Sequence, residues 1–135
     1  MAINKETLRH WGHALLRYGL AVVLLWFGFS QLKSPAGWTR LIPQAMPTVL
    51  SATSWVYVNG IFEVVIAILL MLGLFTRIVS ALVGIHILTI AYVLGYGPVA
   101  VRDAGLAIAA FAVSLHGPDE YCLDNLLQSA KSGGF

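Results

Sequence analysis

Residues 52–74 read ATSWVYVNGIFEVVIAILLMLGL, and this stretch decides the fold class. It is long enough to cross a membrane, because a spanning helix needs about 20 mostly apolar residues. Its one charged residue is Glu63, which stands near the middle of the apolar run. The stretch therefore predicts a membrane helix with an ionisable group deep inside it.

Three other apolar stretches have a comparable length, so that the four expected helices cover residues 14–32, 52–74, 78–96 and 99–115. The alternation of apolar and polar residues that marks a transmembrane barrel is absent. We expect an all-α fold, a four-helix transmembrane bundle with antiparallel up-and-down connections. The helices leave room for a single domain over residues 1–135, ending in a polar tail at 119–135 that is either amphipathic or frayed.

The composition of the whole chain supports an integral membrane protein. Of its 135 residues, 59% are hydrophobic and 10% are charged, whereas soluble domains contain about 25% charged residues. This composition excludes intrinsic disorder, and the single cysteine, Cys122, excludes a disulfide scaffold. The net charge of +2 is too small to indicate nucleic-acid binding. No nucleotide motif or metal-ligand set is recognisable, so neither a nucleotide nor a metal cofactor is expected.

The distribution of lysine and arginine predicts the orientation in the membrane. With four spans, both termini and the link between the second and third helices share one side. That side holds five cations and the other side three: Lys5, Arg9, Arg17, Arg77 and Lys131 against Lys33, Arg40 and Arg102. The count favours cytoplasmic termini for a multi-pass protein of the plasma membrane. The long loop between the first two helices then faces outward, as the expected lid or partner surface.

Glu63 is the principal candidate for function. It lies about 11 residues from either end of its helix, roughly 16 Å deep, where an unpaired carboxylate costs several kcal/mol. His86 falls within about one or two helical turns of the same depth, counted from the tight link at Arg77, and Asn59 lies one turn before Glu63 on the same face. Glu63 and His86 are the expected catalytic pair, relaying protons, and Asn59 an expected ligand contact. The alternatives are structural: Glu63 makes an interhelical hydrogen bond that fixes the bundle, and His86 is a neutral histidine bonded to a neighbouring backbone carbonyl.

Further ligand-binding candidates stand at the ends of the helices, where charged and aromatic side chains gather: Arg17, Arg77, Arg102, Asp103 and Trp38. Each has a structural alternative. The arginines are placed to reach the membrane surface, Asp103 suits the start of a helix, and Trp38 suits an interfacial aromatic belt.

Several stretches together resemble the DoxX family of small four-helix membrane proteins. The resemblance runs from about Arg17 to Asp124. It is carried by Arg17-Tyr-Gly, Phe27-Gly-Phe-Ser-Gln-Leu32, Pro35-Ala-Gly-Trp38, Gly60-Ile-Phe-Glu63, Leu69-Leu-Met-Leu-Gly-Leu-Phe-Thr-Arg77 and Val101-Arg-Asp-Ala-Gly-Leu106. Many members of the family place a lysine where this chain has Gln31, whereas here a lysine follows two residues later, at Lys33.

The resemblance implies a quinone-linked or redox-accessory subunit of a membrane oxidoreductase, of the thiosulfate:quinone or quinol oxidase type. Quinone is then the implied cofactor. Because the chain has no recognisable redox centre of its own, a redox partner protein or a substrate supplies the electrons. The alternative is a non-enzymatic module, such as a small transporter, channel or assembly factor. A bundle this small is expected to form homo-oligomers in the lipid bilayer in that role.

Overall fold

A computed structural model describes residues 4–132 of the chain as a bundle of helices, with no strand in that range. The long helices are α1 (Lys5–Lys33), α2 (Ala52–Leu72), α3 (Thr76–Leu94) and α4 (Pro98–His116), and a shorter α5 (Leu123–Ser132) follows. Within the described range, α1 to α4 are long and apolar enough to cross a membrane. The predicted all-α fold with four membrane helices is confirmed.

The helix boundaries agree with the expected ones except at the start of the chain. Hydropathy placed the start of the first helix at residue 14, whereas α1 begins at Lys5. The Asn4 side chain accepts a hydrogen bond from the Glu6 backbone N–H and caps this polar extension, which an apolar count does not detect. At the far end of α2, Gly73 adopts the left-handed conformation (φ 68°) that commonly ends a helix.

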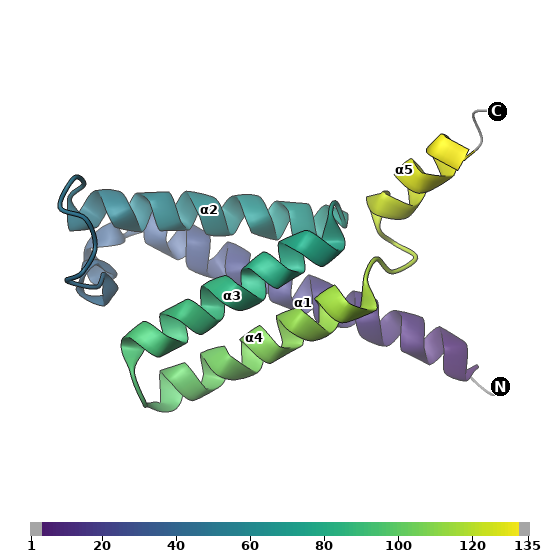
Figure 1. Cartoon of the computed structure of the whole chain (residues 1–135), viewed down its shortest axis with the longest axis horizontal. Helices are drawn as coiled ribbons and strands as arrows, with labels where there is room; N and C mark the ends of the chain where they lie inside the picture. Colours follow the sequence, from purple (N-terminus) through teal and green to yellow (C-terminus); the bar gives the residue numbers. More distant parts are fainter. Residues whose placement is uncertain (1–3, 133–135) are drawn as a thin grey trace.

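The four long helices form two pairs. α1 packs mainly on α2, and α3 packs mainly on α4. The pairs converge where the turn joins α2 to α3 and diverge toward the opposite end, as Figure 1 shows. Near the convergence, all four helices contribute to one apolar core, which includes Leu24, Leu70, Val83 and Ala110. The start of α1 and α5 both lie beyond the converging end.

Two glycines allow α1 and α2 to approach closely. A Cβ atom added to Gly28 would lie 2.7 Å from Cγ2 of Val64 and 2.9 Å from the carbonyl oxygen of Gly60. The backbones therefore nearly touch at this level. The close approach sets the depth at which residues of α1 and α2 meet, including those described below as the polar cluster.

Arg17 ties the segment after α4 to the converging end. Its side chain is fully buried and donates two hydrogen bonds to Asp119, 2.7 Å from Nε and 3.0 Å from Nη2. Nη1 donates to the carbonyls of Leu70 and Met71, at 2.6 and 2.8 Å. These carbonyls belong to the last turn of α2, where helix geometry leaves carbonyls short of partners; that of Leu70 also accepts a bond from the Gly73 N–H, at 3.2 Å. Arg17 thus joins α1, the end of α2 and the segment beyond α4.

Asp124 makes a second connection to the α2–α3 turn. Its carboxylate accepts hydrogen bonds from the backbone N–H groups of Phe75 and Thr76, at 2.7 and 2.8 Å, at the start of α3.

Burial opposes ionisation of the Asp119 carboxyl, but hydrogen bonds from Arg17 and the Tyr121 backbone outweigh the effect of burial. The pKa of Asp119 therefore lies below the ordinary value of an aspartate.

Replacing Gly28 with alanine tests the close approach of α1 and α2. We expect Gly28→Ala to destabilise the protein by about 1–3 kcal/mol, because the new methyl group overpacks the contact. Gly19→Ala is the matched control on the same helix, since a Cβ there meets nothing within 4 Å. Thermal unfolding in detergent measures both variants, and equal melting temperatures for the two would contradict the contact.

Asp119→Asn tests the buried ion pair. At neutral pH we expect a loss of about 3–5 kcal/mol, because Arg17 keeps its charge without a buried counter-charge. The contribution of Asp119 is complete above the unfolded pKa of an aspartate, about 3.9, and disappears as the pH falls through the lower folded pKa.

The stability difference between wild type and Asp119→Asn should therefore narrow below about pH 4. Unfolding measured across this range checks the narrowing, with Glu120→Gln, at an exposed neighbour, as the control. A difference that stays constant with pH would show that Asp119 is not ionised in the folded protein.

Candidate functional site

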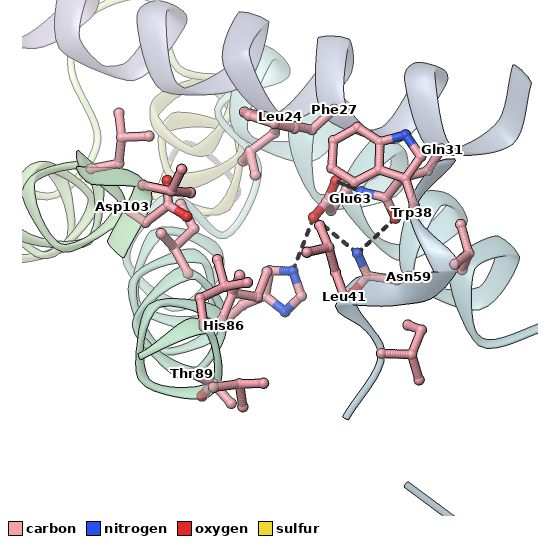
Figure 2. Close-up of a pocket in the computed structure, with 18 of the residues that line it drawn as sticks. Leu24, Phe27, Gln31, Trp38, Leu41, Asn59, Glu63, His86, Thr89 and Asp103 are labelled. Carbon is pink, nitrogen blue, oxygen red and sulfur yellow. Dashed lines mark hydrogen bonds and ion pairs between the residues drawn. The ribbon is translucent and has the colours of Figure 1, made fainter. Parts of the chain in front are cut away.

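The Glu63 carboxylate is the centre of a buried polar cluster formed by Glu63, Gln31, Asn59 and His86. Its side chain is only 5% exposed and accepts hydrogen bonds from three helices. Gln31 of α1 donates from Nε2 to Oε2 at 2.7 Å, and Asn59 of α2 donates from Nδ2 to Oε1 at 3.0 Å. Nε2 of His86, on α3, lies 3.2 Å from Oε1. Figure 2 shows these side chains converging on the carboxylate.

The local sequence explains how the polar cluster assembles. Asn59 lies one turn before Glu63 on α2, so both side chains share a face. Gln31 lies one turn beyond Gly28 on α1, where α1 and α2 approach most closely. Asn59 also donates to Oε1 of Gln31 at 2.9 Å and so holds the amide toward Glu63.

The polar cluster lies at the edge of a cavity of about 290 Å³ between the diverging helix pairs. All four long helices and the loop between α1 and α2 contribute to its wall. Most of the wall is apolar, with side chains such as Val23, Leu24, Ile42, Val56, Ile87, Ile90 and Leu106. The cavity therefore combines an apolar surround with a few convergent polar groups, the usual composition of a small-molecule site.

Three of the residues proposed at the helix ends also line this cavity: Trp38, Arg102 and Asp103. Nη2 of Arg102 lies 2.8 Å from Oδ1 of Asp103, and the Asp103 carboxylate is largely buried. The Phe27 ring packs edge-on against Trp38, with ring centroids 5.7 Å apart. The Arg102 guanidinium lies 5.4 Å from the centroid of the Phe27 ring. The Arg102–Asp103 ion pair thus forms a second polar region of the wall, on α4, with the aromatic rings of α1 and the loop beside it.

The other two predicted residues, Arg17 and Arg77, do not line the cavity. Arg17 is bound to Asp119 at the converging end. Arg77 donates from its guanidinium to the carbonyls of Leu115 and His116, at 3.4 and 3.5 Å, and so caps the end of α4. In these positions, both arginines make contacts that hold the bundle together.

Sequence reasoning assigned no contact to Gln31, although it noted the residue as a departure from the family pattern. A usable signal was present, because Gln31 is a polar residue in an apolar helix, one turn from Gly28. Phe27 was also missed as part of the wall. An aromatic side chain in a membrane helix gives no sign of whether it faces lipid or a cavity.

The cluster has the groups required to hold and pass a proton. Glu63 and His86 are both titratable, and a proton between Oε1 and Nε2 can reside on either. The other ring nitrogen of His86, Nδ1, has no hydrogen-bond partner among the described residues and lies on the far side of the ring from Glu63 (Figure 2). A ligand in the cavity could therefore bond to His86 while His86 remains bonded to Glu63.

Comparison with known proteins gives one result at the level of the family. A family model described as DoxX matches residues 12–96, a range that contains Gln31, Asn59, Glu63 and His86. No curated protein and no solved structure matches the chain significantly.

Gln31→Leu tests whether the hydrogen bond to Glu63 supports the cluster. We expect a loss of about 1.5–3 kcal/mol in stability, because the carboxylate loses one buried, charge-assisted hydrogen bond. Gln128→Leu makes the same chemical change on the exposed surface of α5 and should stay within about 0.5 kcal/mol of wild type. Thermal unfolding in one detergent compares the two; a Gln31→Leu variant as stable as Gln128→Leu would mean that the bond contributes nothing.

Proposed function

This chain belongs to the DoxX family and is a multi-pass membrane protein, and we propose that its cavity binds the head group of a quinone. Glu63 and His86 then exchange protons with the bound ring, and a redox partner protein exchanges the electrons. The protein acts in this view as the quinone-binding membrane subunit of an oxidoreductase. The observation that carries the proposal is the titratable Glu63–His86 pair in an otherwise apolar cavity between membrane helices.

The residues around the cavity suit a quinone. A quinone ring is flat and apolar, and it has two carbonyl oxygens that accept hydrogen bonds. Apolar side chains and the rings of Phe27 and Trp38 supply surfaces for its faces. Donors are present in two regions of the wall, with Gln31, Asn59 and His86 in the first and Arg102 in the second. The volume of about 290 Å³ is at the lower limit of ligand pockets and suits a single ring.

The proton chemistry follows from the polar cluster. Reduction of a quinone to a hydroquinone takes up two electrons and two protons, which leave again on oxidation. His86 is positioned to give a proton to a ring oxygen and to recover one from Glu63 through its other nitrogen. Gln31 and Asn59 hold the Glu63 carboxylate in place during this exchange. Arg102, fixed by Asp103, orients the opposite side of the ring.

Glu63→Gln tests the proposal in purified protein in lipid nanodiscs. We expect its affinity for a water-soluble benzoquinone to fall about tenfold, since the amide keeps only one of the two acceptor oxygens that order Gln31, Asn59 and His86; this equals about 1.4 kcal/mol. The dependence of affinity on pH should also weaken, because Glu63 no longer titrates. Equilibrium binding followed by tryptophan fluorescence measures both quantities.

Glu120→Gln is the control, because that carboxylate lies outside the cavity and is exposed. It should bind quinone as the wild type does. Equal binding by wild type and Glu63→Gln, or no binding by either, would contradict the proposed function.

A further inference from the structure

The cavity has an apolar mouth between α3 and the loop that joins α1 to α2. Thr89 and Val93 line the cavity from α3 and are exposed on the surface. Leu41 and Met46 line it from the loop and are exposed as well. Thr89 follows His86 by about one turn of α3, both line the cavity, and Figure 2 draws Thr89 beyond His86 on the side away from Glu63. The mouth is thus continuous with the polar cluster.

The mouth lies at a depth where it faces lipid. Thr89 precedes the end of α3 at Leu94 by about 8 Å at 1.5 Å per residue. Tyr92 and Tyr96, almost fully exposed near and beyond this end, have the character of interfacial anchors. Thr89 therefore lies on the hydrocarbon side of these tyrosines, and a molecule leaving past it enters the acyl-chain region.

The size of the cavity limits what remains inside it. A volume of about 290 Å³ holds a ring, and a long hydrocarbon chain attached to that ring has to leave the cavity. On the α4 side, the half-exposed Arg102 side chain forms part of the rim, and a permanent charge there does not favour an alkyl chain. The side formed by Thr89, Val93, Leu41 and Met46 has no charged group.

We propose that the ligand of this cavity is a lipid-soluble molecule whose alkyl or isoprenoid tail leaves through the mouth between α3 and the loop into the bilayer. This inference rests on the proposed function and specifies its substrate class. The head group lies against Glu63 and His86, and the tail lies against Thr89 and Val93. Exchange of the ligand then takes place sideways with the membrane, while the loop covers the head group.

Thr89→Trp tests the tail path, because an indole there fills the mouth and leaves the polar cluster intact. Two probes share one dimethoxy-methyl-benzoquinone head, and only one of them has a decyl tail. In nanodiscs we expect Thr89→Trp to weaken binding of the tailed probe about tenfold and to change binding of the tailless probe less than twofold. Val93→Trp is a second variant of the same mouth and should act in the same direction.

Leu88→Trp is the matched control, since Leu88 is exposed on α3 but does not line the cavity. It should leave both affinities unchanged, and thermal unfolding checks that all three variants are folded. If wild type binds both probes and prefers the tailed one, and neither mouth variant alters that preference, the inference is overturned but the proposed function is not. That result would mean that a phospholipid chain, and not the tail of the ligand, occupies the mouth. No binding of either probe to wild type would overturn the proposed function and the inference with it.

Discussion

A carboxylate buried among membrane helices has to be satisfied by other side chains, and the structure around Glu63 meets this requirement. An uncompensated carboxylate in an apolar medium is strongly destabilised, so its partners must lie at the same depth. They come from three helices: Gln31 from α1, Asn59 from α2 itself and His86 from α3. The relative heights of α1, α2 and α3 are therefore fixed at one level, and the close contact at Gly28 makes the bond from Gln31 possible.

The opposite end of the bundle depends on a second buried charge. Arg17 holds the end of α2 and the segment after α4 together through Asp119. At that end the two helix pairs converge (Figure 1) and their apolar side chains form the core. The polar cluster borders the cavity where the pairs diverge. The cavity is a consequence of this geometry. Helices held tightly at one end and separated at the other leave a space that the loop and the side chains of the wall fill only in part.

Hydropathy was sufficient to predict the helices, because the bilayer requires long apolar segments. The depth of Glu63 and His86 could also be compared in advance, since the short turn at Arg77 fixes the heights of α2 and α3. The bonds of Arg17 and Gln31 could not be predicted. Arg17 and Asp119 are far apart in the sequence, and their pairing depends on how the segment after α4 folds back over the α2–α3 turn. Apolar counting likewise gives no account of the cap at Asn4, which sets the start of α1.

Gln31 gives the polar cluster a property that a lysine in its place would remove. Many DoxX members have a lysine at this position, and its charge could balance Glu63 permanently. The amide of Gln31 donates a hydrogen bond but brings no charge. In this chain the group that can carry a balancing charge beside Glu63 is therefore His86, whose Nε2 lies 3.2 Å from Oε1. An isolated charge in an apolar cavity is costly, so in the proposed function a proton given to a ligand leaves the pair with an unbalanced charge. In the proposed function this cost drives the pair to take up a proton again, and it follows from one neutral side chain beside a buried acid.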